Sequence, residues 1–287
     1  MSWTGRFAFV GQDYVLEKNA TLSVFDLGIS RGYALTTSLR SYEGELFLWQ
    51  KYVEKIYQDA ENLDILPPYS FTEIYTILQT LLQKNGLKDA AFKILITGGP
   101  SYNLVLEKPT LAITCTPYIG IDPKFYEKGI SLNTLVFERP YPEMKTTFYL
   151  PAIKSKAAKK PPFEVLYLSK ENHILEASTS NLFIVKKNKL ITPRKKVYKG
   201  ITRELVLTLA TNNYFCEQRE IPFEELKEAD EVFLTATYKD ILPVAKIDQL
   251  TFSYGPVTKY LQKLMQSYVQ KKDWIYKPEI TQTIPNA

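Results

Sequence analysis

Residues 174–186 read ILEASTSNLFIVK, a short polar turn between two apolar runs that carries a single acid, Glu176. Four small residues follow this carboxylate, and a strand-like apolar run begins at Leu182. A glutamate in such a place is most often an exposed turn residue. It acquires a chemical meaning only if a cationic group must be held beside it, so the interpretation depends on the neighbouring segments.

Upstream, residues 143–160 read EMKTTFYLPAIKSKAAKK and hold five lysines. Lys145 stands apart from the others, because Met144 and the run Phe148–Leu150 give it apolar neighbours. Such a setting can lower the pKa of the amine, which favours its use as a nucleophile. The remaining lysines are expected on a helix that faces solvent, where they could attract an anionic substrate: Lys154, Lys156, Lys159 and Lys160.

Downstream, two segments have the features of anion sites. In the segment KGITRE, residues 199–204, a glycine precedes Thr202, which is expected to cap the following helix. The N-terminus of a helix offers unpaired N–H groups and the positive end of a dipole, so a phosphate could dock there. The segment TAT, residues 235–237, closes a strand with hydroxyl groups that can also bind phosphate.

Composition excludes several classes of protein. The chain has 287 residues with 36 basic and 31 acidic side chains, and a net charge of +5 is too small and too scattered for a nucleic-acid binder. No apolar run is long enough to span a membrane. Cys115 and Cys216 lack metal-ligand spacing, which favours buried thiols in a cytoplasmic protein. Since His173 is the only histidine, we expect no metal site and no serine–histidine triad.

The pattern of apolar residues predicts two domains. A smaller N-terminal α+β domain is expected over residues 1–118, a linker over 119–124, and a larger C-terminal domain over 125–287. The predicted elements of the first domain are strands at 7–10, 21–25, 92–97 and 110–116 and helices at 47–63 and 70–82. In the second domain, short strands precede two predicted helices, at about 202–213 and 255–269.

The order of lysine, carboxylate, glycine-led helix and threonine-rich strand end resembles the fold-type IV, or class IV, pyridoxal-phosphate enzymes. This family contains branched-chain aminotransferases, D-amino acid aminotransferases and aminodeoxychorismate lyases. The matching pieces are EASTSNLF at 176–183, LITP at 190–193, KGITR at 199–203, TAT at 235–237 before Pro243-Val244, and KTTFYL at 145–150. The N-terminal half follows the family more loosely, from Val10 to Gly44.

The resemblance implies a fold, a cofactor and an assembly. The fold would be α/β (α+β) with two domains, and pyridoxal 5′-phosphate would bind in the cleft between them. The protein would be a homodimer that takes amino acids and 2-oxo acids as substrates.

The resemblance also assigns site residues. Lys145 takes the position of the Schiff-base lysine, and Glu176 that of the carboxylate that meets the pyridine nitrogen. The remaining cofactor-binding residues that it implies are Ile201, Thr202, Ala236 and Thr237 at the phosphate, Tyr149 near the phenolic oxygen, and Lys55 in place of the usual phosphate-binding arginine. The candidates for substrate binding are Tyr33, Thr37, Arg40 and Arg139.

Departures from the family pattern bear on the substrate. Asn103 and Val105 stand where D-amino acid aminotransferases have the arginine and histidine that bind the substrate carboxylate, so activity on D-amino acids is disfavoured. Thr37-Ser38 is similar to the paired threonines of aminodeoxychorismate lyases. Lysine at position 55 keeps the charge of arginine but loses its bidentate fork.

Three functions are therefore compatible with the sequence. The first is a transaminase that moves an amino group between an amino acid and a 2-oxo acid through a Lys145 Schiff base. The second uses the same lysine and cofactor to form p-aminobenzoate and pyruvate from aminodeoxychorismate. The third is a non-catalytic binding protein with the same fold, which the altered residues at 32–34 and Lys55 motivate.

Overall fold

The computed structural model describes residues 5–158 and 161–278. Packing divides these residues into two compact units. The first unit comprises the described parts of residues 1–118, 145–147 and 273–287, and the second comprises Ile119–Met144 and Phe148–Lys272. Each unit is therefore made of segments that are not consecutive in the sequence. The predicted domains, with their linker at 119–124, follow chain order and stay a prediction.

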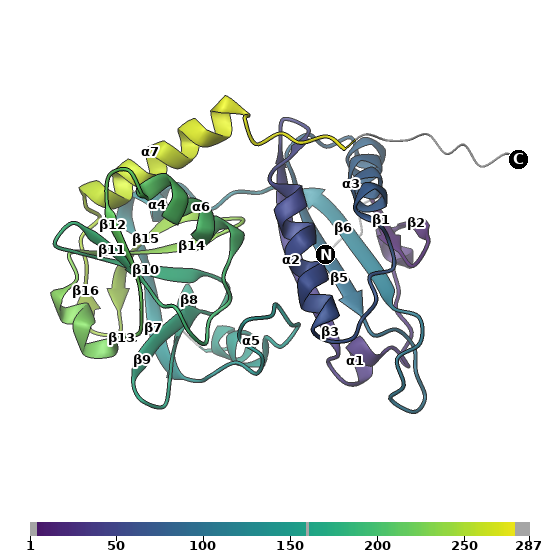
Figure 1. Cartoon of the computed structure of the whole chain (residues 1–287), viewed down its shortest axis with the longest axis horizontal. Helices are drawn as coiled ribbons and strands as arrows, with labels where there is room; N and C mark the ends of the chain where they lie inside the picture. Colours follow the sequence, from purple (N-terminus) through teal and green to yellow (C-terminus); the bar gives the residue numbers. More distant parts are fainter. Residues whose placement is uncertain (1–4, 159–160, 279–287) are drawn as a thin grey trace, which may run out of the picture. The chain divides into compact units, whose positions relative to one another are not determined.

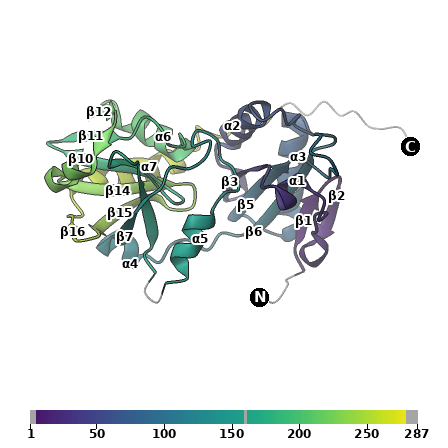
Figure 2. The ribbon, with the colours of Figure 1, turned by 90° about the horizontal axis from the view of Figure 1, so that it is seen from below.

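The first unit is an antiparallel sheet with two helices on one face (Figures 1 and 2). Its strand order is β2-β1-β6-β5-β3-β4. The strands are β1 (Phe7–Val10), β2 (Asp13–Leu16), β3 (Ala34–Tyr42), β4 (Glu45–Leu46), β5 (Ala90–Thr97) and β6 (Thr110–Pro117). The helices are α1 (Leu27–Ser30), α2 (Trp49–Glu61) and α3 (Phe71–Asn85), with a 3₁₀ turn at Glu17–Asn19.

Local sequence explains both long helices of this unit, which confirms the predicted helices at 47–63 and 70–82. Along α2, the residues Tyr52, Val53, Ile56 and Ala60 recur at helical spacing and are buried. The helix α3 begins at a capping box, in which Ser70 accepts from the Glu73 main-chain N–H while the Glu73 carboxylate accepts from that of Ser70. It ends at Gly86, whose φ of 61° is left-handed.

The strand predicted at 21–25 is wrong. The partner of β1 is β2, which pairs Phe7 with Leu16, and residues 20–25 form a loop. The alternation in TLSVF resembles a half-buried strand, yet Val24 is 74% exposed and Phe25 is 49% exposed. These apolar side chains do not enter the core of the unit, so the pattern carried no information about strand pairing.

The second unit is built on a ten-stranded mixed sheet whose path is β12-β11-β10-β14-β15-β7-β8-β9-β13, with β16 paired to β15. The first five strands are β7 (Ile130–Val136), β8 (Glu164–Leu168), β9 (His173–Ala177), β10 (Asn181–Lys186) and β11 (Lys189–Thr192). The others are β12 (Phe215–Gln218), β13 (Ile221–Pro222), β14 (Glu231–Ala236), β15 (Asp240–Ile247) and β16 (Leu250–Thr251). The helices are α4 (Lys124–Lys128), α5 (Leu150–Lys156), α6 (Ile201–Ala210) and α7 (Pro256–Lys271), with a 3₁₀ helix at Phe223–Glu228.

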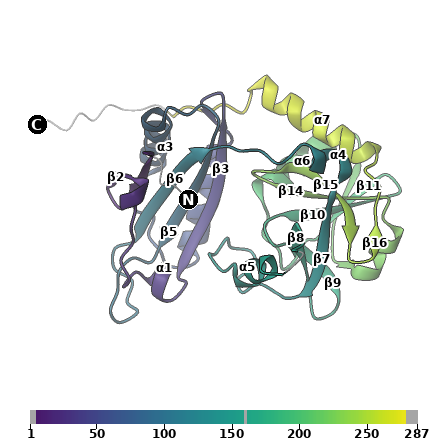
Figure 3. The ribbon, with the colours of Figure 1, turned by 180° about the vertical axis from the view of Figure 1, so that it is seen from behind.

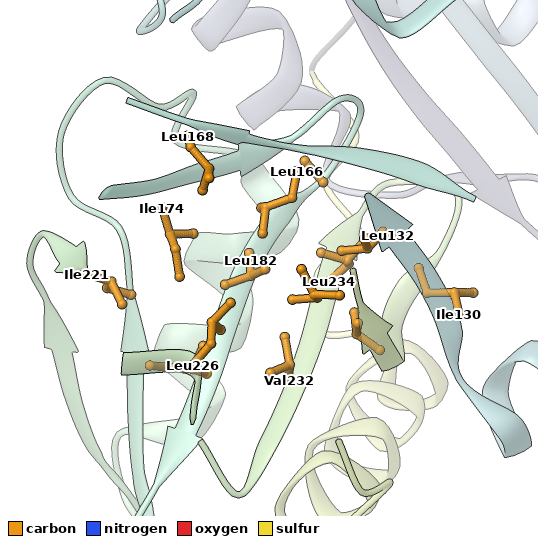
Figure 4. Close-up of a cluster of buried hydrophobic side chains, with 14 of the residues drawn as sticks. Ile130, Leu132, Leu166, Leu168, Ile174, Leu182, Ile221, Leu226, Val232 and Leu234 are labelled. Carbon is orange, nitrogen blue, oxygen red and sulfur yellow. The ribbon is translucent and has the colours of Figure 1, made fainter. Parts of the chain in front are cut away.

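A large apolar core lies in this unit, and Figure 4 shows its side chains pointing toward one another. Leucine, isoleucine and valine dominate it, and the strands β8, β9, β10 and β14 that contribute to it are buried along nearly their whole length. Its labelled members are Ile130, Leu132, Leu166, Leu168, Ile174, Leu182, Ile221, Leu226, Val232 and Leu234. The mixed α+β class that the sequence predicts is confirmed.

The helix α7, yellow in Figure 3, covers part of this sheet and is fixed at its start by an acid. The buried carboxylate of Glu231 accepts hydrogen bonds from the main-chain N–H groups of Val257 and Thr258, at 3.0 and 2.8 Å. These groups have no partner within the helix, and the negative charge suits the positive end of the helix dipole. The predicted helices at 202–213 and 255–269 correspond to α6 and α7.

After α7 the chain returns to the first unit. Trp274 is buried there against Phe47, with ring centroids 4.9 Å apart, and also lies near Tyr42. The Trp49 Nε1–H donates to the main-chain oxygen of Tyr276 at 2.9 Å, and the two rings stack. These aromatic contacts make residues 274–276 an integral part of the first unit.

Across residues 5–158 and 161–278, no helix combines the length and the apolar character that crossing a bilayer requires.

The loop between β5 and β6 provides a test of this packing. Gly99 has a φ of +77°, and a Cβ there would lie 1.9 Å from the main-chain oxygen of Lys108. We expect Gly99→Ala to destabilise the protein by about 3 kcal/mol or more, because it adds a clash with main chain to the cost of a left-handed conformation. The midpoint of chemical unfolding measures the effect.

The matched control is Gly86→Ala, since Gly86 has a similar φ of +61° but nothing within 4 Å of its Cβ position. It should cost only about 1 kcal/mol. Equal losses of stability in the two variants would contradict the role assigned to the Lys108 contact.

Candidate functional site

The acid of the opening stretch, Glu176, is buried in the second unit. It lies on β9, where its Oε1 accepts from Arg139 Nε at 2.7 Å. Its Oε2 accepts from the main-chain N–H of Tyr198 at 3.1 Å and from Asn181 Nδ2 at 3.4 Å. A carboxylate surrounded by donors in this way keeps its negative charge in a dry setting, so it can pair with a cationic N–H of a bound molecule.

Asn181 links this carboxylate to the start of α6. Its Nδ2 also donates to the main-chain oxygen of Tyr198 at 2.6 Å, and its Oδ1 accepts from Gly200 N–H at 3.2 Å. A Cβ at position 200 would lie 2.6 Å from that Oδ1, so a larger residue there would require the Asn181 side chain to shift. The amide thereby holds Glu176 and the N-terminus of a helix in one hydrogen-bonded group.

The helix α6 begins with Gly200 as its N-cap, and no side chain caps it. The expected cap, Thr202, is wrong: this residue is the second of the helix and is buried. The N–H groups of the first turn, including those of Ile201 and Thr202, have no partner within the helix. They therefore present donors and the positive end of the helix dipole, as an anion site requires.

The threonine-rich end of β14 lies next to Asn181 in the sheet. β14 pairs with β10 so that Thr235 is opposite Asn181, and α6 packs against β14. The Thr235 hydroxyl is buried with no hydrogen-bond partner among the residues that the structure describes. Ala236 ends the strand and Thr237 follows in the turn. An unsatisfied buried hydroxyl beside a glycine-capped helix fits a phosphate group.

A buried ion pair joins the two turns that carry these residues. Glu164, at the start of β8, accepts through Oε1 from Lys239 Nζ and from Ser180 Oγ, both at 2.6 Å. Its Oε2 accepts from the main-chain N–H of Thr179 at 2.7 Å. Lys239 Nζ also donates to Thr179 Oγ1 at 2.6 Å and to Ser180 Oγ at 2.9 Å. The pair therefore connects the turn after Glu176 with the turn that contains Thr237.

Sequence reasoning missed both partners of this pair. Burial acts to raise the pKa of the Glu164 carboxyl, but the Lys239 ammonium and the hydrogen bonds from Ser180 and Thr179 outweigh it and lower that pKa. The available signal was the composition of EVLYL at 164–168, where one acid opens an otherwise apolar strand.

Arg139, a candidate for substrate binding, contacts other residues of the protein through its guanidinium. Besides its contact to Glu176, its Nη1 donates to the Met144 oxygen at 3.2 Å and its Nη2 to the Pro142 oxygen at 2.6 Å. The guanidinium thus holds Glu176 and the chain just before Lys145 with its fixed fork of donors. We do not retain Arg139 among the substrate-binding residues.

Tyr149 precedes α5 as its N-cap residue and is partly exposed, and its contact with the cofactor stays a prediction. On this helix Lys154 and Lys156 are exposed, as expected, whereas Lys159 and Lys160 lie outside the described residues.

Lys145 belongs by its packing to the first unit. Its main-chain oxygen accepts from Thr36 N–H of β3 at 2.8 Å, and Thr147 N–H donates to the oxygen of Ala34 at 3.2 Å. Its own N–H donates to Asp59 Oδ2 at 3.1 Å. Residues 145–147 are therefore fixed along the first residues of β3.

Lys55 lies on α2 in the same unit, one helical turn before Asp59. Its Nζ is 3.0 Å from Asp59 Oδ1. The cation that stands in place of the family's arginine is thus adjacent to the acid that holds the Lys145 segment. Sequence reasoning did not select Asp59, which is separated from Lys145 by 86 positions.

Tyr33 and Thr37 remain candidates for substrate binding. Tyr33 comes directly before β3, and its hydroxyl donates to the main-chain oxygen of Leu63. Thr37 is buried within β3, where it is opposite Ile94 of β5. The first unit therefore fixes Tyr33 through its hydroxyl and Thr37 through the main-chain pairing of β3.

Arg40 packs against aromatic side chains of the first unit. Its guanidinium lies between the rings of Tyr42 and Tyr118, 3.9 and 3.8 Å from their centroids, and the residue is buried. Cation–π contacts on both faces stabilise it in place. We therefore do not carry Arg40 into the proposed substrate site.

Within the described part of the chain, no group of three or more histidine, cysteine or acidic side chains could hold a metal ion.

Comparison with known proteins identifies a family. The family model described as "Amino-transferase class IV" matches residues 34–247. A Methanocaldococcus jannaschii protein, provisionally assigned as a branched-chain-amino-acid aminotransferase, is 29% identical over 273 residues, which cover 91% of this chain and 94% of that protein. The D-alanine aminotransferase of Listeria monocytogenes serotype 4b is 25% identical, with coverage of 91% and 94%.

The fold also matches solved structures. The T.th. branched-chain amino acid aminotransferase, crystallised with pyridoxamine 5′-phosphate, superimposes with a TM-score of 0.86 at 21% identity. The match covers 95% of this chain and 98% of that one. At this identity the similarity establishes the fold.

The Glu164–Lys239 pair yields a stability prediction. We expect Lys239→Met to destabilise the protein by about 3–5 kcal/mol, because it leaves a buried carboxylate without its cation. Adding Glu164→Gln should recover part of this loss. Chemical unfolding measures both variants, and Lys227→Met, which breaks the exposed Lys227–Glu224 pair, should change stability little.

The same pair should be sensitive to acid. The folded-state pKa of Glu164 is lower than its ordinary 4.5, so the stabilisation is fully present above about pH 4.5 and is lost as the pH falls through the folded-state pKa. The stability difference between wild type and Lys239→Met should therefore shrink in acid. A difference that stays constant down to the acid limit of folding would contradict this account.

Proposed function

The chain belongs to the class IV aminotransferase family, and we propose that it moves an amino group from an amino acid to a 2-oxo acid with pyridoxal 5′-phosphate as cofactor. The observation that carries this proposal is the buried Glu176 carboxylate, held by Arg139 and joined through Asn181 to the glycine-capped start of α6. A negative charge beside an anion site matches a ligand that has a cationic ring nitrogen and a phosphate.

The cofactor, when bound, supplies an aldehyde that condenses with amines and a ring that accepts the electrons of a broken Cα bond. Lys145 would supply the amine that condenses with the aldehyde, and it would move the proton at the substrate Cα. Glu176 would accept a hydrogen bond from the ring nitrogen and so favour the positive charge of the ring. Together these two residues would perform the steps that transamination requires of the protein.

The phosphate would be held mainly by uncharged donors. We assign it to the α6 N-terminus and the end of β14, and the Thr235 hydroxyl supports this placement because it has no partner among the described residues. The phosphate set is Ile201, Thr202, Ala236 and Thr237, with Lys55 as the cation. Tyr149 is assigned to the phenolic oxygen.

Substrate selection is assigned to Tyr33 and Thr37, with L-amino acids favoured. The Asn103 side chain forms a hydrogen bond within its own loop, where its Oδ1 accepts from Val105 N–H at 3.4 Å. Val105 is an exposed apolar residue. Neither side chain offers the cation that would bind the carboxylate of a D-amino acid.

We also propose a homodimer in the cytoplasm. Exposed apolar side chains on the first unit support the dimer, because contact with a partner chain would remove them from water. These side chains are Val24, Phe25, Ile29, Tyr102, Leu104 and Val105, and the rings of Phe25 and Tyr102 are 4.9 Å apart. Cys115 and Cys216 are both free thiols, as a reducing compartment favours.

Lys145→Ala tests the central assignment. The wild-type chain incubated with pyridoxal phosphate should turn yellow, and borohydride should fix a covalent adduct on Lys145 that mass spectrometry detects. The variant should form no adduct and should lose at least about 10²-fold in amino transfer from glutamate to 2-oxo acids, since it lacks both nucleophile and proton carrier. An adduct on another lysine in the variant would overturn the assignment.

The same preparation separates the alternatives. Release of p-aminobenzoate and pyruvate from aminodeoxychorismate, without glutamate-dependent transfer, would identify the lyase. A wild-type chain that binds no pyridoxal phosphate would indicate the non-catalytic binding protein.

Gly200→Ala tests the anion site. The φ of Gly200 is −68°, which any residue adopts, so alanine should act only through its Cβ, which would press on Asn181 Oδ1. We expect the dissociation constant of pyridoxal phosphate to rise about tenfold through displacement of the helix start. Binding of pyridoxal, which lacks the phosphate, should change less. Equal weakening of both ligands would contradict the placement of the phosphate.

A further inference from the structure

Asp59 is a buried acid that contacts two residues of the proposed site. It lies on α2 and is only 1% exposed. Its Oδ1 accepts from Lys55 Nζ at 3.0 Å, and its Oδ2 accepts from the main-chain N–H of Lys145 at 3.1 Å. All three residues belong to the first unit, so one carboxylate joins a helix to the segment that carries the cofactor lysine.

The main chain at Lys145 is held from two sides. Thr36 N–H of β3 binds its oxygen, and Thr147 N–H binds the oxygen of Ala34, so β3 holds one side of the segment. The N–H of Lys145 itself is bound by Asp59. Since β3 is paired along its length with β5, both anchors are regular elements of the unit rather than loops.

The charge of Asp59 requires compensation, because a carboxylate removed from water is costly without a cation. Lys55 provides it from the preceding turn of the same helix, in the i,i+4 arrangement that brings side chains together. This gives the lysine at position 55 a structural purpose beyond charge at the phosphate. An ammonium has three donors, so one can bind Asp59 while others serve a phosphate.

We propose that Asp59 is a positioning residue for the cofactor-binding lysine: its carboxylate fixes the main chain at Lys145, and Lys55 balances its charge. This rests on the proposed function, in which Lys145 bonds the cofactor aldehyde. Because Asp59 contacts the main chain of Lys145, its effect does not depend on the phosphate of the cofactor. An aldehyde without a phosphate should therefore reveal it.

The experiment uses the full chain without cofactor and two probes, pyridoxal phosphate and pyridoxal. The Lys145 amine adds to the aldehyde with loss of water, and borohydride then delivers a hydride that converts the C=N bond to a stable secondary amine. Timed quenching and mass spectrometry give the rate of adduct formation. The variants are Asp59→Asn, Asp59→Ala, Lys55→Met and Lys55→Met/Asp59→Asn, and thermal unfolding is recorded for each before any probe is added.

Asp59→Ala removes the acceptor of the Lys145 N–H, so adduct formation should slow about tenfold, and by the same factor with either probe. Asp59→Asn should stay close to wild type, because its amide oxygen can still accept that N–H. Lys55→Met should lower the melting temperature of the cofactor-free chain by leaving the carboxylate uncompensated, and the double variant should recover part of the loss.

The control is Glu231→Gln, which alters another buried carboxylate that accepts main-chain N–H groups. It should lower the melting temperature and leave the adduct rate unchanged. Wild-type rates with pyridoxal in both Asp59 variants would overturn the proposal, as would a loss confined to pyridoxal phosphate. If the wild-type chain itself forms no adduct with either probe, the proposed function fails first, and the premise of this inference fails with it.

Discussion

A carboxylate cannot be buried without donors around it, and in the second unit the burial of Glu176 fixes much of its surroundings. Arg139 reaches it from the chain before Lys145, Tyr198 from the loop before α6, and Asn181 from β10, the next strand along the chain. Arg139 also binds the Pro142 oxygen, and Asn181 also binds the main chain of Tyr198 and Gly200. A movement of the acid would therefore disturb all three segments. The cost of an unsatisfied charge in an apolar interior is what makes this arrangement specific.

The same constraint recurs at other acids, among them Glu164 and Asp59, and each of these connects segments far apart in the sequence. Glu164 joins two turns of the second unit, and Asp59 joins a helix to the Lys145 segment in the first. In all three cases the carboxylate accepts at least one main-chain N–H, which fixes backbone rather than a flexible side chain. The apolar cores supply most of the stabilisation, while the buried acids determine where the chemically active residues lie.

Several features were predictable because their signals are local. Apolar periodicity predicts α2, α3, α6 and α7, and the order of motifs identifies the family. The predictions of a strand at 21–25 and of a helix cap at Thr202 failed, because each local sequence pattern is compatible with two structures. The alternation at 21–25 occurs on an exposed loop, and Thr202 follows a glycine that is itself the cap. Asp59 was missed because only the packed chain shows what it contacts.

The aromatic residues after α7 have a consequence for how the protein is made. The first unit needs Trp274 against Phe47 and the main chain of Tyr276 against Trp49 before its packing is complete. A ribosome delivers the segment with Trp274 only after the whole second unit has been synthesised. Most of the first unit must therefore wait, partly assembled, while the second folds, and chaperones would meet an exposed aromatic surface during that interval.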